Sequence, residues 1–448
     1  MSRRTIISTC LRCLTLGSSI LACSNRHVDL GGGTVAQEVQ RGSRCSASTI
    51  VSDDVSVADQ DDLDALLGCE EIRGDLSVSV FEGTDLRPLR HLRVVDGWVA
   101  LGDATLSTVA EAAPAKVDRA QQIIEAGWLP SLEGVESLER VGGLVLQGLS
   151  APDLRAFESL RSVGNETLYI SGAKNLIDLR GLEQVPPFTW IELNGNPSLE
   201  SLEGLQVASS LQQLILESTP RLADIGALSS VESVEGALFL ADTSVPNLDA
   251  LSHLNVVYSG LGLIGNAQLT QVDALASLIN VSGGLAFYRN PKLERLPDFS
   301  NLLNIDDFRA RDNAELSAIS FNFPHRQMVS LIDPSDLDID DWDTSSGVIE
   351  IGSNPKLETL AFEAGFTVAH VVYVHDNGGL TRLELGSLRR LDRLTIKGNA
   401  NLTDVNLGEL QTVDSLSVGD NPRLDPSELR NVRTFESEFS GNADEPAP

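Results

Sequence analysis

Apolar residues recur along most of the chain in one fixed frame. The frame is an apolar residue, any residue, a second apolar residue, two further residues, an asparagine, and a leucine three positions later; one copy is Leu285, Phe287, Asn290 and Leu293. The alternation predicts a short strand whose apolar side chains face inward and whose intervening side chains face outward. The asparagines of the frame are Asn196, Asn266, Asn290, Asn313, Asn354, Asn377, Asn399 and Asn421.

Weaker copies of the frame lack the asparagine. They start at Leu76, Val99, Leu144, Leu168, Leu214, Leu238 and Val329, and a degenerate copy contains Gln121 and Ile123. Of the sixteen copies that result, the fifteen steps from Leu76 to Leu416 average 22.7 residues, within the range of about 20–29 residues of leucine-rich repeats. We therefore predict a right-handed β-solenoid of about sixteen coils with a long parallel sheet. It covers 45–442, with 45–75 as an N-terminal cap and 443–448 as a tail.

We expect the repeated asparagines to be structural. An asparagine side chain both donates and accepts hydrogen bonds, so a stack of them satisfies backbone groups that would otherwise be buried without partners. This predicts a buried asparagine ladder, and no ligand role for these residues.

The N-terminal residues are typical of an export signal. Arg3 and Arg4 precede an apolar run that is too short to cross a bilayer, so 1–22 is expected to be a signal peptide. The run ends in Leu21-Ala22-Cys23, which resembles a bacterial lipobox and implies lipidation of Cys23. Ordinary cleavage near Ala22 and twin-arginine export remain alternatives. Residues 23–44 are predicted to be a flexible tether.

Cysteine usage agrees with export. Cys45 and Cys69 are the only cysteines in the predicted folded part, and an oxidising compartment would join them in a disulfide. The expected location is an outer-membrane or cell-surface lipoprotein, with the periplasm as the alternative. The membrane contact would be through the N-terminal lipid only.

The charge of the chain limits its partners. The formal net charge is −31, from 64 acidic and 33 basic residues, so its field repels nucleic acid phosphates. No nucleic-acid partner is expected.

The segment in which the coils begin resembles a known family. Cys69-Glu70-Glu71-Ile72-Arg73-Gly74-Asp75-Leu76 is similar to the opening of receptor L domains, and its Val-x-Gly-x-Leu phrase returns at Val234 to Leu238. The resemblance covers about Cys45 to the C-terminus, although receptor L domains have far fewer coils. It implies ligand binding or surface architecture, and it brings no catalytic residues.

We find no sequence motif for catalysis, a metal or a cofactor. The six histidines form no HExxH pair, and neither GxSxG nor GxxxxGK occurs. The acidic stretch from Asp333 to Asp343 only partly matches a calcium loop, so a solvated acidic loop is the simpler interpretation. A polysaccharide-directed β-helix enzyme and a purely structural envelope protein remain alternatives to a binding protein.

Outward strand positions are the candidate binding residues. In the predicted register they include Tyr169, Trp190, Tyr288, Arg309, Arg311, Tyr373 and His375, with Glu192 and Phe239 also facing outward. Aromatic and arginine side chains are enriched at interface hot spots. We predict a non-catalytic protein that recognises an unknown protein or glycan through an exposed sheet; scattered surface residues without a role are the alternative.

Overall fold

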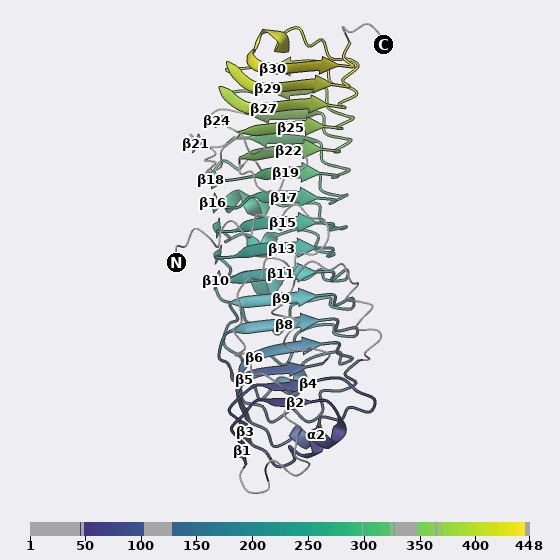
Figure 1. The fold of residues 1–448 in the computed structure, drawn as a ribbon, viewed down its shortest axis with the longest axis vertical. Helices are drawn as coiled ribbons and strands as arrows, with labels where there is room; N and C mark the ends of the chain where they lie inside the picture. The colour runs from purple at the N-terminus through teal and green to yellow at the C-terminus, as the bar shows by residue number, and fades with distance from the viewer. Residues whose placement is uncertain are drawn as a thin grey trace. The chain divides into compact units, whose positions relative to one another are not determined.

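The computed structural model describes residues 45, 49–102, 128–297, 299–322, 326–327, 347–362, 366–368 and 370–443. They fall into two compact units that divide after Ser230, and each unit is a stack of strand-containing coils (Figure 1). The predicted signal peptide 1–22, the predicted tether 23–44 and Cys23 lie outside the described residues. Among the residues described, no helix has both the length and the apolar character to cross a membrane.

The first unit lies within 45–230. Its elements are β1 (Ile50–Val51), β2 (Val55–Val57), α2 (Gln60–Asp64), β3 (Glu71–Ile72), β4 (Leu76–Val78), η3 (Arg87–Leu89), β5 (Val94–Leu101), β6 (Arg140–Gln147), η4 (Arg155–Phe157), β7 (Ser162–Val163), β8 (Thr167–Ser171), β9 (Trp190–Asn194), β10 (Ser210–Leu211), β11 (Gln213–Glu217) and η5 (Gly226–Leu228). Strands β2, β4, β5, β6, β8, β9 and β11 pair in this order, all in parallel.

The second unit lies within 231–443. Its elements up to the gap at 328–346 are β12 (Ser233–Val234), β13 (Ala237–Ala241), η6 (Asp249–Leu251), β14 (Val256–Val257), β15 (Gly260–Ile264), η7 (Asp273–Ser277), β16 (Asn280–Val281), β17 (Leu285–Tyr288), β18 (Asn304–Ile305), β19 (Phe308–Arg311), β20 (Ala318–Phe321) and β21 (Arg326–Gln327). Those after it are β22 (Val348–Gly352), β23 (Thr359–Phe362), β24 (Phe366–Val368), β25 (Val371–His375), β26 (Arg382–Glu384), β27 (Arg390–Lys397), β28 (Asp404–Asn406), β29 (Thr412–Gly419), η9 (Leu429–Asn431) and β30 (Arg433–Ser440).

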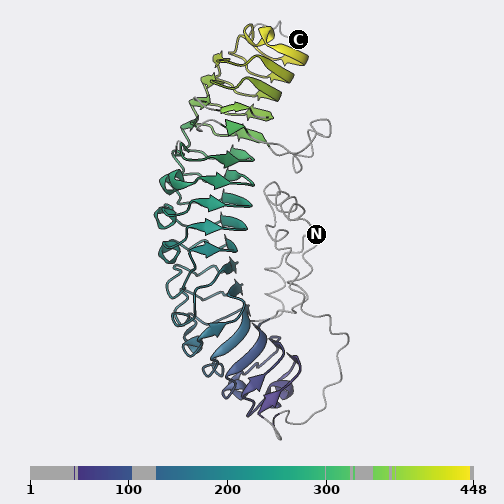
Figure 2. The ribbon, with the colours of Figure 1, turned by 90° about the vertical axis from the view of Figure 1, so that its left-hand side faces the viewer.

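The main sheet of the second unit contains one strand from each coil. Strands β13, β15, β17, β19, β22, β25, β27, β29 and β30 pair in parallel in this order. In Figure 2 these strands lie along one side of the coils, and the connecting segments lie along the other. The connecting segments carry two smaller parallel sheets, β12-β14-β16-β18 and β20-β23-β26-β28. The inward residues of the frame, such as Leu261 and Leu263, are completely buried between them.

Fourteen of the sixteen predicted coils fall on described residues, and each has a strand of a main sheet at the predicted position. The other two, at Gln121 and Val329, lie outside the described residues. At both places the flanking strands are direct neighbours, since Val99 pairs with Leu144 and Phe308 pairs with Ile349. The prediction of a further coil between each pair of strands is therefore wrong. The spacing alone could not show this, because an insertion about one coil long preserves the period.

The predicted asparagines of the second unit form a continuous ladder. The backbone N–H of Asn354 donates to Oδ1 of Asn377 over 3.1 Å, and its Nδ2 donates to the same oxygen and to the Ala310 carbonyl, over 3.2 and 2.9 Å. The same pattern links the asparagines from Asn266 to Asn421, and Asn442 accepts from Asn421. All of them are buried, so the ladder pairs polar groups inside the coils.

A left-handed residue precedes each ladder asparagine. Its φ is 52° at Arg289, 52° at Ser353 and 69° at Gly398. This conformation turns the chain sharply after the strand and points the next side chain inward. Glycine adopts it without strain and aspartate tolerates it, which accounts for the Gly-Asn and Asp-Asn pairs along the sequence.

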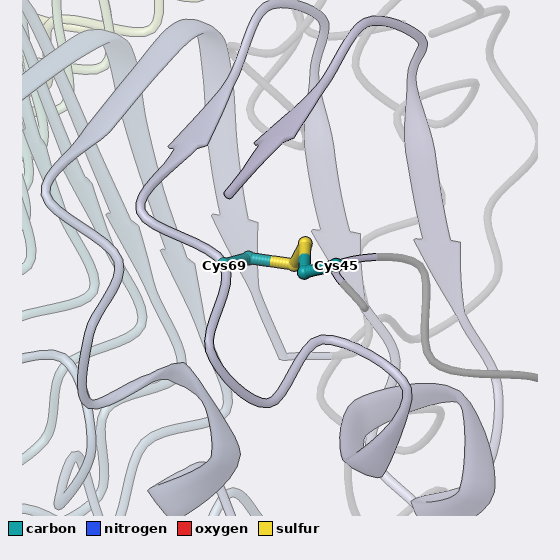
Figure 3. The surroundings of a disulfide bond; sticks show 2 residues. All are labelled: Cys45 and Cys69. Atoms are coloured by element: carbon teal, nitrogen blue, oxygen red, sulfur yellow. A yellow bond between two sulfur atoms is a disulfide. The ribbon is translucent and has the colours of Figure 1, made fainter. Parts of the chain in front are cut away.

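The predicted disulfide lies at the start of the first unit. Cys45 and Cys69 are bonded, with Cα atoms 5.3 Å apart (Figure 3). Cys69 is buried beside β3, so the bond ties Cys45 to the first strands of the unit; the predicted role of this segment as a cap stays a prediction.

Candidate functional site

A group of polar side chains lies on the outward face of the main sheet in the second unit. We call it the outward cluster, and its members are Tyr288 on β17, Asp307, Arg309 and Arg311 at β19, Glu350 on β22, and Tyr373 and His375 on β25. The strand register aligns Tyr288 with Arg311, then Gly352, then His375. The pairing therefore brings together five of the seven predicted binding residues.

Arg309 lies between two partners. Its Nη2 is 3.6 Å from Oδ2 of Asp307, and its guanidinium also donates a hydrogen bond to the Tyr288 hydroxyl. Asp307 in turn accepts the Val348 backbone N–H over 2.9 Å. The carboxylate thus fixes the first residue of β22 as well as the arginine.

Glu350 joins the other two charged residues of the cluster. Its Oε1 is 3.0 Å from Nη1 of Arg311 and 3.3 Å from Nε2 of His375. The second ring nitrogen of His375, Nδ1, is 3.0 Å from Oδ2 of Asp376. With a carboxylate oxygen at both nitrogens, the doubly protonated imidazolium is favoured. The Tyr373 ring stacks on the His375 ring, with centroids 4.2 Å apart.

Burial and charge together set the protonation of these groups. Burial, with the charge of Asp307, raises the pKa of Asp306 to about 7, and burial raises the pKa of Asp307 to about 6 despite Arg309 and backbone donors. Burial opposes the charged form of His375, but hydrogen bonds to Glu350 and Asp376 outweigh it and raise the pKa of His375. At Glu350 burial is outweighed by His375 and the arginines, so the pKa of Glu350 is lowered.

The predicted binding residues differ in how far they reach solvent. Arg309, His375 and Tyr169 are only 4%, 7% and 8% exposed, and the outward residues Glu192 and Phe239 are buried as well. Tyr288, Arg311, Tyr373 and Trp190 are partly exposed. Strand alternation predicts which side of the sheet a residue occupies, but it does not show what packs on that side.

Tyr169 and Trp190 belong to the first unit, so they are not part of the outward cluster. Tyr169 packs with Ala100 and Val145, and Trp98 lies against the same group. These outward positions form a small apolar cluster. A packing role is thus sufficient to explain Tyr169.

Glycines on the outward face lie under rings from neighbouring strands. A Cβ atom on Gly352 would meet the His375 ring, and one on Gly262 would meet the Phe239 ring. Trp98 lies over Gly143 in the first unit in the same way. Glycine at these sites lets a ring lie flat on the sheet. The position of His375 beside Glu350 therefore depends on Gly352.

Two acidic members of the cluster, Asp307 and Glu350, were missing from the predicted site. The signal for Glu350 was present, because it lies between the inward residues Ile349 and Ile351. Asp307 precedes Phe308 directly and faces outward by the same alternation. Both were missed because the prediction considered aromatic and basic residues and not the carboxylates that hold them.

The described residues show no metal centre. No group of three or more histidine, cysteine or acidic side chains there could hold a metal ion. The candidate calcium stretch, Asp333 to Asp343, lies outside the described residues, so it stays a prediction. In the outward cluster, buried carboxylates hold arginine, tyrosine and imidazole groups. These hydrogen-bond donors are suited to binding anionic groups.

Comparison with known proteins gave structural neighbours only. No protein-family model and no curated protein matches the sequence. A domain of InlJ from Listeria monocytogenes that includes a cysteine ladder is 12% identical over 83% of this chain and 74% of its own, with a TM-score of 0.27. A leucine-rich-repeat protein from Leptospira interrogans is 14% identical over 84% and 89%, with a TM-score of 0.26. One from Bacteroides ovatus is 10% identical over 66% and 87%, with a TM-score of 0.20.

The fold assignment rests on the coils themselves. A strand in each coil, inward leucines and a buried asparagine at the following turn recur with the repeat length expected from the sequence. The narrower resemblance to receptor L domains stays a prediction. The chain is a leucine-rich-repeat-like β-solenoid.

Proposed function

We propose that this chain is a non-catalytic recognition protein of the cell envelope, which binds a partner protein through the outward face of the main sheet in the second unit. The observation that carries the proposal is the outward cluster. Folding alone does not require the buried Arg309, Asp307 and Glu350 of this cluster, because buried ion pairs contribute little net stability. The tyrosine and arginine side chains of the cluster are of the types that are enriched at protein interfaces.

A lipid anchor is the second part of the proposal. Support comes from the sequence, in which Cys23 follows an apolar run and a small residue. We expect the intact mass of the protein from its native membrane fraction to include a diacyl or triacyl group, and Cys23→Ala to lack it. An unmodified chain that starts near Cys23 would contradict the anchor and leave a secreted protein.

Site-specific photo-crosslinking tests the binding face. The chain offers a matched pair of tyrosines: Tyr373 lies in the outward cluster, whereas Tyr258 follows β14 in a different sheet and is 51% exposed. A photoreactive phenylalanine replaces one or the other in the full chain, in cells that produce it. We expect a discrete protein adduct from position 373 and none from position 258.

The other outcomes separate the alternatives. No adduct from position 373, or the same adduct from both positions, would overturn binding through this face. Turnover of a polysaccharide by the purified chain would favour the enzyme. If the chain gives neither an adduct nor turnover, but its deletion from cells weakens the envelope, the structural role would be favoured.

A further inference from the structure

On strands β19 to β27 the charged side chains of this face that reach solvent are positive, whereas Glu436 and Glu438 on β30, two strands beyond β27, are exposed acidic residues of the same face. The side chains of Arg311 and Lys397 are 43% and 57% exposed, while those of Asp307 and Glu350 are 4% and 7% exposed. Arg393 is half-buried on the same face of β27. We call Arg311, Arg393 and Lys397, with Tyr373 between them, the cationic patch. It stands out in a chain with a net charge of −31.

The strand register defines the layout of the patch. Arg311 and Lys397 occupy the same row of the sheet, since Arg311 pairs with Gly352, Gly352 with His375, and His375 with Lys397. They are three strands apart, or about 14 Å at the usual strand spacing, and Arg393 lies about 13 Å from Lys397 along β27. A single small anion cannot bridge such distances. An extended chain that carries several anionic groups can.

Two of the three cations are available for an external anion. Arg393 has no ion-pair partner among the residues that the structure describes, although its neighbours Arg389 and Arg390 each bind a carboxylate, in Glu409 and Asp414. Lys397 is 3.9 Å from Asp420, at the limit of an ion pair between exposed groups. Arg311 is different, because Glu350 holds one of its nitrogens and orients the rest of the guanidinium.

We propose that the cationic patch binds an acidic, extended segment of the partner protein, whose carboxylates pair with Arg311, Arg393 and Lys397. The inference rests on the proposed function, which makes the partner a protein, and on the charge complementarity of the patch. Buried Glu350 keeps Arg311 in place before the ligand arrives, which lowers the entropic cost of binding.

The test uses the full chain and a fluorescein-labelled peptide of twelve residues, with glutamate at every fourth position among glycine and serine. Fluorescence anisotropy measures its binding in low salt. We expect saturable binding that weakens at least tenfold in Arg393→Gln with Lys397→Gln. The same peptide with glutamine in place of glutamate should not bind.

Arg382→Gln is the matched control, because it removes one positive charge from β26 in another sheet. Unchanged binding in this variant, together with unchanged thermal melts of all variants, would support the patch. The proposal would be overturned if Arg382→Gln lost as much peptide binding as the double variant. It would also be overturned if the acidic peptide did not bind, or if polygalacturonate bound and the peptide did not. If crosslinking from position 373 still captures a protein, the proposed function stands and only the acidic ligand is wrong.

Discussion

The two units differ in how they fill the turn after each strand. In the second unit, asparagine occupies this position from Asn266 to Asn442, and each amide before Asn442 binds the coils on both sides. In the first unit the same position is Leu149, Ala173, Asn196 and Thr219 in successive coils. Asn196 still accepts the Ala173 N–H and donates to the Ile170 carbonyl, but Thr219 Oγ1 has no hydrogen-bond partner. The coil thus tolerates loss of the ladder at single positions.

The outward faces of the main sheets also differ between the two units. The first unit places Ala100, Val145 and Tyr169 together, whereas the second unit places charged residues at the aligned positions Arg309 and Glu350. Apolar packing and ion pairing can therefore occupy the same face of this sheet. The inward leucines, which are alike in both units, set the fold.

Of the changes considered, removal of one ladder amide should lower the free energy of unfolding the most. Asn377→Ala deletes the donor to the Ile351 carbonyl and the acceptor for the Asn354 N–H, so both buried groups lose these partners, while Asn399 Oδ1 keeps only the backbone N–H of residue 377. We expect a loss of about 3–5 kcal/mol in the free energy of unfolding of the second unit, measured by amide hydrogen exchange. Asn406→Ala, at an exposed asparagine, is the control. A loss below about 1 kcal/mol would show that the ladder is no more important than the turns of the first unit.

Loss of the disulfide should affect the first unit alone. Cys45 and Cys69 are 24 residues apart, and closure of such a loop stabilises by about 3–4 kcal/mol in the chain-entropy model. Replacement of both with serine should lower the urea midpoint of the tryptophan fluorescence transition, because three of the four tryptophans, Trp98, Trp128 and Trp190, belong to this unit. Equal weakening of exchange protection in the second unit would contradict independent capping.

The outward cluster and the adjacent Asp306 should give the second unit a pH dependence. His375 has a raised pKa, so its stabilisation is complete below about pH 6.5 and is lost as the pH rises through its folded value. Asp306 and Asp307, with pKa values of about 7 and about 6, also retain protons that the unfolded chain releases. Glu350 has the opposite effect on stability, because its pKa is lowered. The stabilisation from its charged form is lost as the pH falls through that pKa.

We therefore expect the stability of the second unit to be highest near pH 4.5 and to decline by on the order of a few kcal/mol toward pH 8, because Asp306, Asp307 and His375 all hold protons more tightly in the folded chain. Denaturant titrations across this range measure it. His375→Gln should flatten the decline, and Gly352→Ala should do the same by displacing the His375 ring. A wild-type profile that rises from pH 6 to pH 8 would contradict the assignment.

Extension of the ladder into the first unit should have the smallest effect. The turn at Thr219 matches that at Asn196, since Leu222 N–H donates to the Thr219 carbonyl as Leu199 N–H does to Asn196, and Ser218 has a φ of 53°. Thr219→Asn should add about 1 kcal/mol by giving Asn196 a ladder partner, visible as a higher melting temperature. Destabilisation would mean that the first unit cannot accommodate the larger amide.

Most of the fold could be predicted from the sequence, because leucine, asparagine and their spacing act within one coil. The positions of the strands around Leu261 or Val372 follow from that local pattern. Two features could not be predicted in this way. The direct pairing of Val99 with Leu144 depends on which coils contact each other, and the burial of Arg309 depends on side chains from outside its own strand, such as Tyr288.

The candidate site was predictable only in part. Outward alternation identified Tyr288, Arg311 and Tyr373, but the partners of Glu350 come from strands 39 and 25 residues away. Such contacts depend on the register between coils and on ring orientation over Gly352, neither of which a single strand encodes.

The ladder also has a direction. From Asn266 to Asn399, the backbone N–H of each ladder asparagine donates to the side chain of the asparagine in the following coil, as from Asn290 to Asn313 and from Asn313 to Asn354. When the chain is made or exported with its N-terminus first, each coil completes its hydrogen bonds only after the next coil has emerged. Assembly of the second unit therefore trails the emerging chain by one repeat, and the most recent coil is always the least protected from proteases.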